Sequence, residues 1–79
     1  STLRETISAS GSKYANLMNQ LEIAESKFEG AKKDIQRVKS RYSRGEISKD
    51  AYGKLLEEYQ SRIEDAESTI DGVLLRLRD

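Results

Sequence analysis

The chain has 79 residues, enough for one small domain, of which 35% are charged and 35% are apolar. The 14 basic and 14 acidic residues cancel, so no net charge draws the chain to nucleic acid or anionic lipid. Cysteine and histidine are both absent, which excludes disulfides and thiolate metal sites and removes the commonest general base. The low apolar fraction is typical of disorder or of long, narrow helices, and apolar periodicity has to decide between them.

No apolar run approaches the roughly 20 residues that span a bilayer, and no signal peptide is visible. The sequence therefore predicts a soluble, cytoplasmic protein. It starts at Ser1 rather than at methionine, which indicates either a fragment of a longer protein or a processed start.

The first half of the chain places apolar residues at alternating steps of three and four, the heptad pattern of a coiled-coil helix. Gly11 and the serines around it are poor helix formers, so the helix can break there, with Ser12 as a new N-cap. We expect an N-terminal overhang over residues 1–12, helical or frayed, and a helix over 13–44. The a positions are Ile7, Tyr14, Leu21, Phe28, Ile35 and Tyr42, and the d positions are Leu3, Ser10, Leu17, Ala24, Ala31 and Val38.

The segment that follows carries the signals of a helix end and a helix start. Basic residues crowd the end of the first helix, where the macrodipole favours positive charge. Gly45 can take the left-handed conformation that ends many helices. Ser48 is a good N-cap for a second helix, and Ile47 is expected to pack under the bend. The sequence predicts a turn over residues 45–48.

The heptad pattern then resumes and predicts a second helix over residues 49–78. If the two helices fold back on each other, facing core residues have numbers with a constant sum, and each layer matches an a position with a d position. The layers are Tyr42–Tyr52, Val38–Leu56, Ile35–Tyr59, Ala31–Ile63, Phe28–Ala66, Ala24–Ile70, Leu21–Val73 and Leu17–Leu77. The predicted fold class is all-α: an antiparallel coiled-coil helical hairpin in one domain, able to associate into a helical bundle.

Charged residues beside this seam give weaker information on the register. Asp34 is expected to face Arg62 on one side, while Glu25 opposite Glu67 is a mismatch. Exposed pairs contribute only a fraction of a kcal/mol. On a larger scale, residues 27–44 carry seven basic and two acidic residues, and residues 57–71 carry six acidic and one basic. The two arms therefore attract each other when antiparallel.

Several apolar residues lie beyond the end of the second helix or outside the seam of the hairpin, as Ile23, Leu55 and Leu75 do, while Leu74 flanks the seam opposite Met18. Leu77 meets Leu17, so the first helix extends past the end of the second. In one interpretation the overhang frays or folds back and its apolar residues are ordinary exposed ones. In the other, a second copy or the rest of a longer protein covers them. The candidate interaction residues are Leu3, Ile7, Tyr14, Ile23, Leu74 and Leu75, and the expected partner is a second copy or another coiled-coil protein.

Residues for chemistry are scarce. Adjacent carboxylates such as Glu57 and Glu58 point in different directions on a helix, and no phosphate loop, nucleophile elbow or metal-ligand cluster is present. We therefore predict no catalytic, cofactor or metal residues and a non-enzymatic interaction module. The alternative is a nucleic-acid-binding helical stalk that uses the basic face around Lys32 and Arg44. We favour it less, because the acidic arm and the helix C-terminus account for the same charges.

The turn also carries a resemblance. The pattern Tyr-x-x-Gly-Glu-Ile-Ser-x-x-x-Tyr, from Tyr42 to Tyr52, resembles a turn of archaeal coiled-coil proteins. It is similar to the central helical region of the CdvA family of archaeal cell-division proteins, over roughly residues 31–63. Short helical-hairpin domains at many bacterial C-termini use a similar turn. Proteins of the CdvA family recruit ESCRT-III-like partners to membrane, and the resemblance implies a scaffold in cell division or membrane remodelling. The family's N-terminal β-domain and partner-binding tail are not in this sequence, so only the turn residues Gly45, Ile47 and Ser48 carry over.

Overall fold

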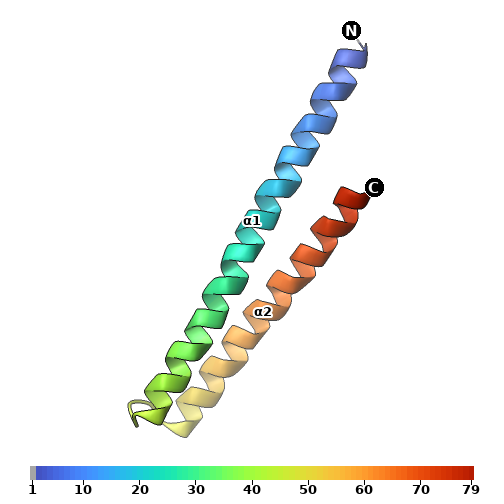
Figure 1. The fold of residues 1–79 in the computed structure, drawn as a ribbon. Coiled ribbons are helices and arrows are strands. Elements are labelled where there is room, and N and C mark those ends of the chain that lie inside the picture. The colour runs from blue at the N-terminus through green and yellow to red at the C-terminus, as the bar shows by residue number, and fades with distance from the viewer. Residues whose placement is uncertain (1) are drawn as a thin grey trace.

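The computed structural model describes the backbone of residues 2–79 and the side chains of residues 11–79. It contains α1, Thr2–Ser43, and α2, Lys49–Arg78, joined by a short connection. Figure 1 shows α2 returning along α1 in the opposite direction, and the Cα atoms extend over 66 × 14 × 14 Å. The prediction of an all-α helical hairpin is confirmed, and the coiled-coil packing of the pair stays a prediction.

α1 ends in the hydrogen-bond arrangement known as a Schellman motif. The amide of Glu46 donates to the carbonyl of Arg41 at 2.9 Å, and the amide of Gly45 donates to the carbonyl of Tyr42 at 3.0 Å. Gly45 has φ of +72°, the left-handed conformation that this motif needs and that glycine adopts without a Cβ penalty. The Glu46 carboxylate also contacts the guanidinium of Arg44 at 2.9 Å and that of Arg41 at 4.0 Å, which holds the turn against the last turn of α1.

α2 begins with the side-chain cap that the sequence indicates. Ser48 has φ of −73° and ψ of 159°, and its Oγ accepts a hydrogen bond from the amide of Ala51 at 3.1 Å. This bond satisfies one of the amides that the first turn of a helix leaves free. Ile47, between the two caps, is half-buried. The two caps stop one helix and start the next within a few residues, so the chain must reverse there.

The predicted layers agree with the pattern of burial. At the turn, the rings of Tyr42 and Tyr52 stack with centroids 4.2 Å apart and planes 14° apart, a favourable aromatic geometry. The buried residues are all members of predicted layers: Leu17, Ala24, Ala31, Val38, Ala66 and Val73. The Tyr42–Tyr52 pair is therefore observed as predicted, and the pairing of the other layers stays a prediction.

The ion pairs differ from the expectation that Asp34 faces Arg62. Asp34 instead pairs with Arg37 at 3.2 Å, and Arg62 pairs with Glu58. Each ion pair found among residues 11–79 joins side chains of the same helix or lies at the turn. Partners three or four residues apart on a helix already lie within reach, so these long side chains need not cross the seam.

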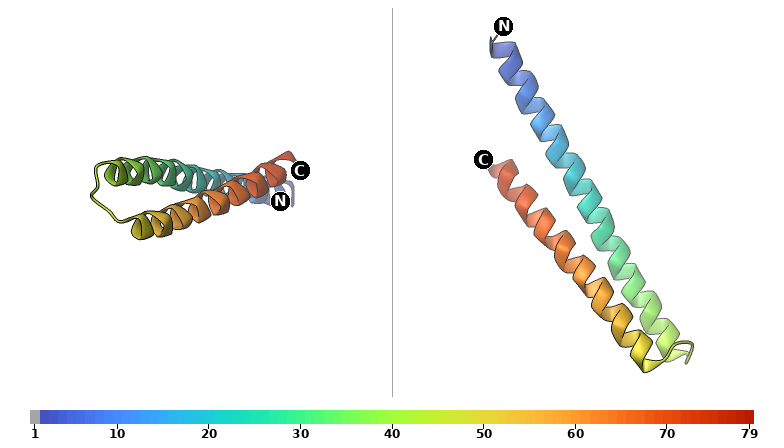
Figure 2. Two further views of the ribbon diagram at one scale, coloured as in Figure 1. Left: turned by 90° about the horizontal axis from the view of Figure 1, so that it is seen from below. Right: turned by 180° about the vertical axis from the view of Figure 1, so that it is seen from behind.

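Figure 2 shows that α1 extends well past the end of α2 at the terminal end of the hairpin. α1 passes through Gly11 and Ser12 without interruption. The N-terminal overhang of residues 1–12 projects beyond α2 where the structure describes its backbone, from residue 2 on. No segment of the described chain lies beside this part of α1 (Figure 1).

Candidate interaction surfaces

The four candidate interaction residues whose side chains are described are exposed. Tyr14 and Leu75 are each 59% exposed, Ile23 is 49% exposed and Leu74 is 45% exposed. The side chains of Leu3 and Ile7 lie outside the described residues. Burying the exposed apolar surface of these side chains against a partner would contribute about 25 cal/mol of free energy for each Å² covered.

These exposed residues do not form one patch. Tyr14 continues the seam of α1, past the point where α2 ends. Leu74 and Leu75 are consecutive residues of α2, and consecutive side chains on a helix point about 100° apart. Ile23 lies on the opposite flank of the seam from Leu74, by its place in the heptad. The sequence alone could not say which of these residues share a surface.

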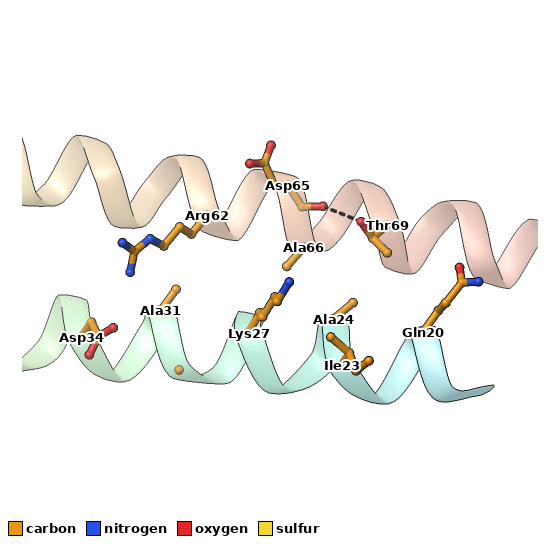
Figure 3. Close-up of a pocket in the computed structure, with 11 residues that line it drawn as sticks. Gln20, Ile23, Ala24, Lys27, Ala31, Asp34, Arg62, Asp65, Ala66 and Thr69 are labelled. Atoms are coloured by element: carbon orange, nitrogen blue, oxygen red, sulfur yellow. Dashed lines mark hydrogen bonds between the residues drawn. The ribbon is translucent and has the colours of Figure 1, made fainter. Parts of the chain in front are cut away.

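A groove runs along the flank that carries Ile23, between the two helices (Figure 3). It has a volume of about 660 Å³, and its floor contains Ala24, Ala31 and Ala66. Gly30 also lines it, and a Cβ at that position would meet no atom within 4 Å. Small residues at these positions leave a hollow where larger ones would fill the space.

The edges of this groove are polar and of mixed charge. α1 contributes Lys27 and Asp34, and α2 contributes Arg62 and Asp65 (Figure 3). Thr69 lies at the same edge, and its hydroxyl donates to the carbonyl of Asp65 at 3.1 Å. The sequence did not reveal this groove, because in the predicted layers each of these alanines faces a large residue. The signal in the sequence was alanine at consecutive d positions beside a glycine.

The ion pairs leave a separation of charge between the helices. On residues 27–44 of α1, the basic side chains outside the observed ion pairs are those of Lys27, Lys33 and Lys39, all exposed. On residues 57–71 of α2, the corresponding acidic side chains are those of Glu57, Glu64, Asp65, Glu67 and Asp71, also exposed. The outer surface is therefore basic along part of α1 and acidic along part of α2.

Residues 11–79 contain no group of three or more side chains that could hold a metal ion. Neither helix, over the residues described, has a stretch long and apolar enough to cross a membrane. Comparison with known proteins found no match to a family model, a curated protein or a solved structure. The surfaces themselves have to carry the functional argument.

Proposed function

We propose that this chain is a non-enzymatic helical module that acts by assembling with another helical protein, in the first place with a second copy of itself. The observation that carries the proposal is the exposure of Tyr14 and Leu74 at the terminal end of the hairpin. Large apolar side chains there offer about 25 cal/mol for each Å² to a partner that covers them. Over the described residues, no segment lies beside the part of α1 past the end of α2.

The cellular role is proposed from the turn. The resemblance of Tyr42–Tyr52 to the CdvA family supports a cytoplasmic scaffold in cell division or membrane remodelling. The stacked tyrosines, the hydrogen bonds of Gly45 and Glu46 and the cap at Ser48 give most residues of that pattern a part in the turn. This explains why such a pattern suits a helical hairpin, and the cellular role rests on the resemblance alone.

A nucleic-acid-binding stalk is the alternative. Its support is the exposed group of Lys27, Lys33 and Lys39, which form no ion pair among the described residues. The other basic residues of this stretch are engaged by Glu29, Asp34 and Glu46. Phosphate contacts weaken steeply with salt, so a salt titration of RNA binding separates this function from protein assembly.

Sedimentation tests the proposed assembly. We expect the full chain to run as a dimer or larger, with melting that depends on concentration, since association stabilises the folded state by mass action. A chain that begins at Ser12 should shift toward the monomer, because it lacks the apolar positions Leu3 and Ile7. Circular dichroism of both proteins checks that the hairpin stays helical. A full chain that remains monomeric at high concentration would refute the proposal.

A further inference from the structure

Among the residues whose side chains are described, each buried residue occupies a d position of the seam: Leu17, Ala24, Ala31, Val38, Ala66 and Val73. The larger d residues Tyr52 and Tyr59 are half-buried. At the described a positions of the same helices, no side chain is buried. Leu21, Phe28 and Ile35 of α1 are half-buried, and so are Ile63 and Ile70 of α2.

Heptad geometry places these half-buried a residues on one face. In an antiparallel pair, the a positions of both helices lie beside the e positions, and the d positions lie beside the g positions. The half-buried a residues therefore form a continuous strip opposite the flank of the groove, and the exposed Leu74, at an e position, lies at its end. We call Leu21, Phe28, Ile35, Ile63, Ile70 and Leu74 the apolar strip.

The hairpin has little core without this strip. Three of its buried residues are alanines, which bury little apolar area. Chains of this size rarely bury enough surface to be very stable alone, and association is one of the usual remedies. Covering the apolar strip would complete the burial of the larger a residues.

The face that carries the strip has the size of a stable interface. α2 has 30 residues, so at 1.5 Å per residue the paired part of the hairpin is about 45 Å long, and two helices side by side are about 20 Å wide. The footprint is roughly 900 Å² for each copy, close to the roughly 800 Å² per partner of a standard interface. A second hairpin of the same length covers this face completely.

Charge decides how the second copy lies. Two such faces can meet about a two-fold axis in two ways. If α1 lies over α1 and α2 over α2, the acidic stretch of residues 57–71 meets the same stretch of the other copy. If α1 of each copy lies over α2 of the other with the turns at the same end, that acidic stretch lies level with residues 23–37, which carry four basic and three acidic residues. Like charges across an interface are unfavourable, and opposite charges favour association.

We propose that a second copy of this chain covers the apolar strip, with α1 of each copy over α2 of the other and both turns at the same end. This inference rests on the proposed function and adds the face and the orientation of the pair. In this orientation both overhangs project from the same end of the dimer.

The orientation is tested by one distance. The chain has no cysteine, so Ser43→Cys, at the end of α1, gives a single site for a spin label. With the turns at the same end, we expect the two labels of a dimer within about 30 Å of each other. If the two turns instead lay at opposite ends of the dimer, the two labels would be about 40 Å apart along the helix axis. About 25 residues of helix, at 1.5 Å each, would then separate them. Ser68→Cys, near the middle, should give similar distances in both arrangements and serves as the control.

The face is tested by two neighbouring substitutions with the same chemical change. Leu74→Lys alters the end of the apolar strip, whereas Leu75→Lys alters the outer side of α2. We expect Leu74→Lys to raise the dimer dissociation constant about tenfold or more, and Leu75→Lys to change it about twofold at most. Sedimentation measures both, and circular dichroism confirms that each variant is helical.

The outcomes separate this inference from the proposed function. A dimer with a short Ser43 distance and a greater sensitivity at Leu74 supports both. A dimer with a long Ser43 distance, or with a greater sensitivity at Leu75, overturns the inference and leaves the assembly function standing. A full chain that stays monomeric at high concentration overturns both.

Discussion

Gly45 and Gly30 allow the fold to be tested, because replacing each of them by alanine should change the stability of the protein in opposite directions. Gly45 has φ of +72°, and a Cβ there would meet no atom within 4 Å. The cost of Gly45→Ala is therefore conformational and not steric: about 1–2 kcal/mol for an L-residue in the left-handed region. Lower entropy of the unfolded chain offsets about 0.4–1 kcal/mol of this cost. We expect a net destabilisation of about 1 kcal/mol.

Gly30→Ala is the matched control, inside α1. Its Cβ would also meet no atom within 4 Å, and its backbone is helical. Replacing a glycine inside a helix by alanine stabilises it by about 0.5–1 kcal/mol. The two variants should therefore move in opposite directions and differ by roughly 2 kcal/mol, which for a domain of this size is about 8–16 °C in melting temperature.

Urea unfolding followed by far-UV circular dichroism measures both variants, at one protein concentration so that association contributes equally. If Gly45→Ala proves as stable as the parent or more so, α1 does not end in a left-handed residue at this position. If both variants are stabilised alike, the two helices instead form one continuous rod. Either result would refute the hairpin turn described above.

The remaining predictions concern the cap of α2 and the core. Ser48→Ala should destabilise the protein by about 1 kcal/mol, because the amide of Ala51 loses its acceptor. Ser43→Ala should have little effect. Equal losses of stability at both serines would mean that α2 starts elsewhere. Val73 is 1% exposed, so Val73→Ala should cost about 1–3 kcal/mol in thermal or urea unfolding. Ser68→Ala, on the exposed side of α2, should stay within about 0.5 kcal/mol, and a Val73 variant as stable as this control would contradict the seam.

The sequence by itself determined the local features of this protein. Apolar residues at alternating steps of three and four positions predict helices, because with 3.6 residues per turn this spacing places them on one side of a helix. Gly45 and Ser48 predict the end of α1 and the start of α2 because both signals are short-range and depend on a few adjacent residues. The register follows from the same pattern, since only one alignment pairs Tyr42 with Tyr52 and every a position with a d position.

Only the tertiary structure decided which residues of the seam are buried. Heptad positions a and d look equivalent in the sequence, yet Val73 is buried while Leu21, in the same layer, is half-buried. The groove beside Ala24 and Ala31 could not be predicted for the same reason: the space left beside a small residue depends on the path of the partner helix, which no local pattern records. Asp34 forms its ion pair with Arg37 and not with Arg62, and this too depends on the distances between the helices. The surfaces available to a partner are thus properties of the packed pair, and the sequence alone could name their residues but not their arrangement.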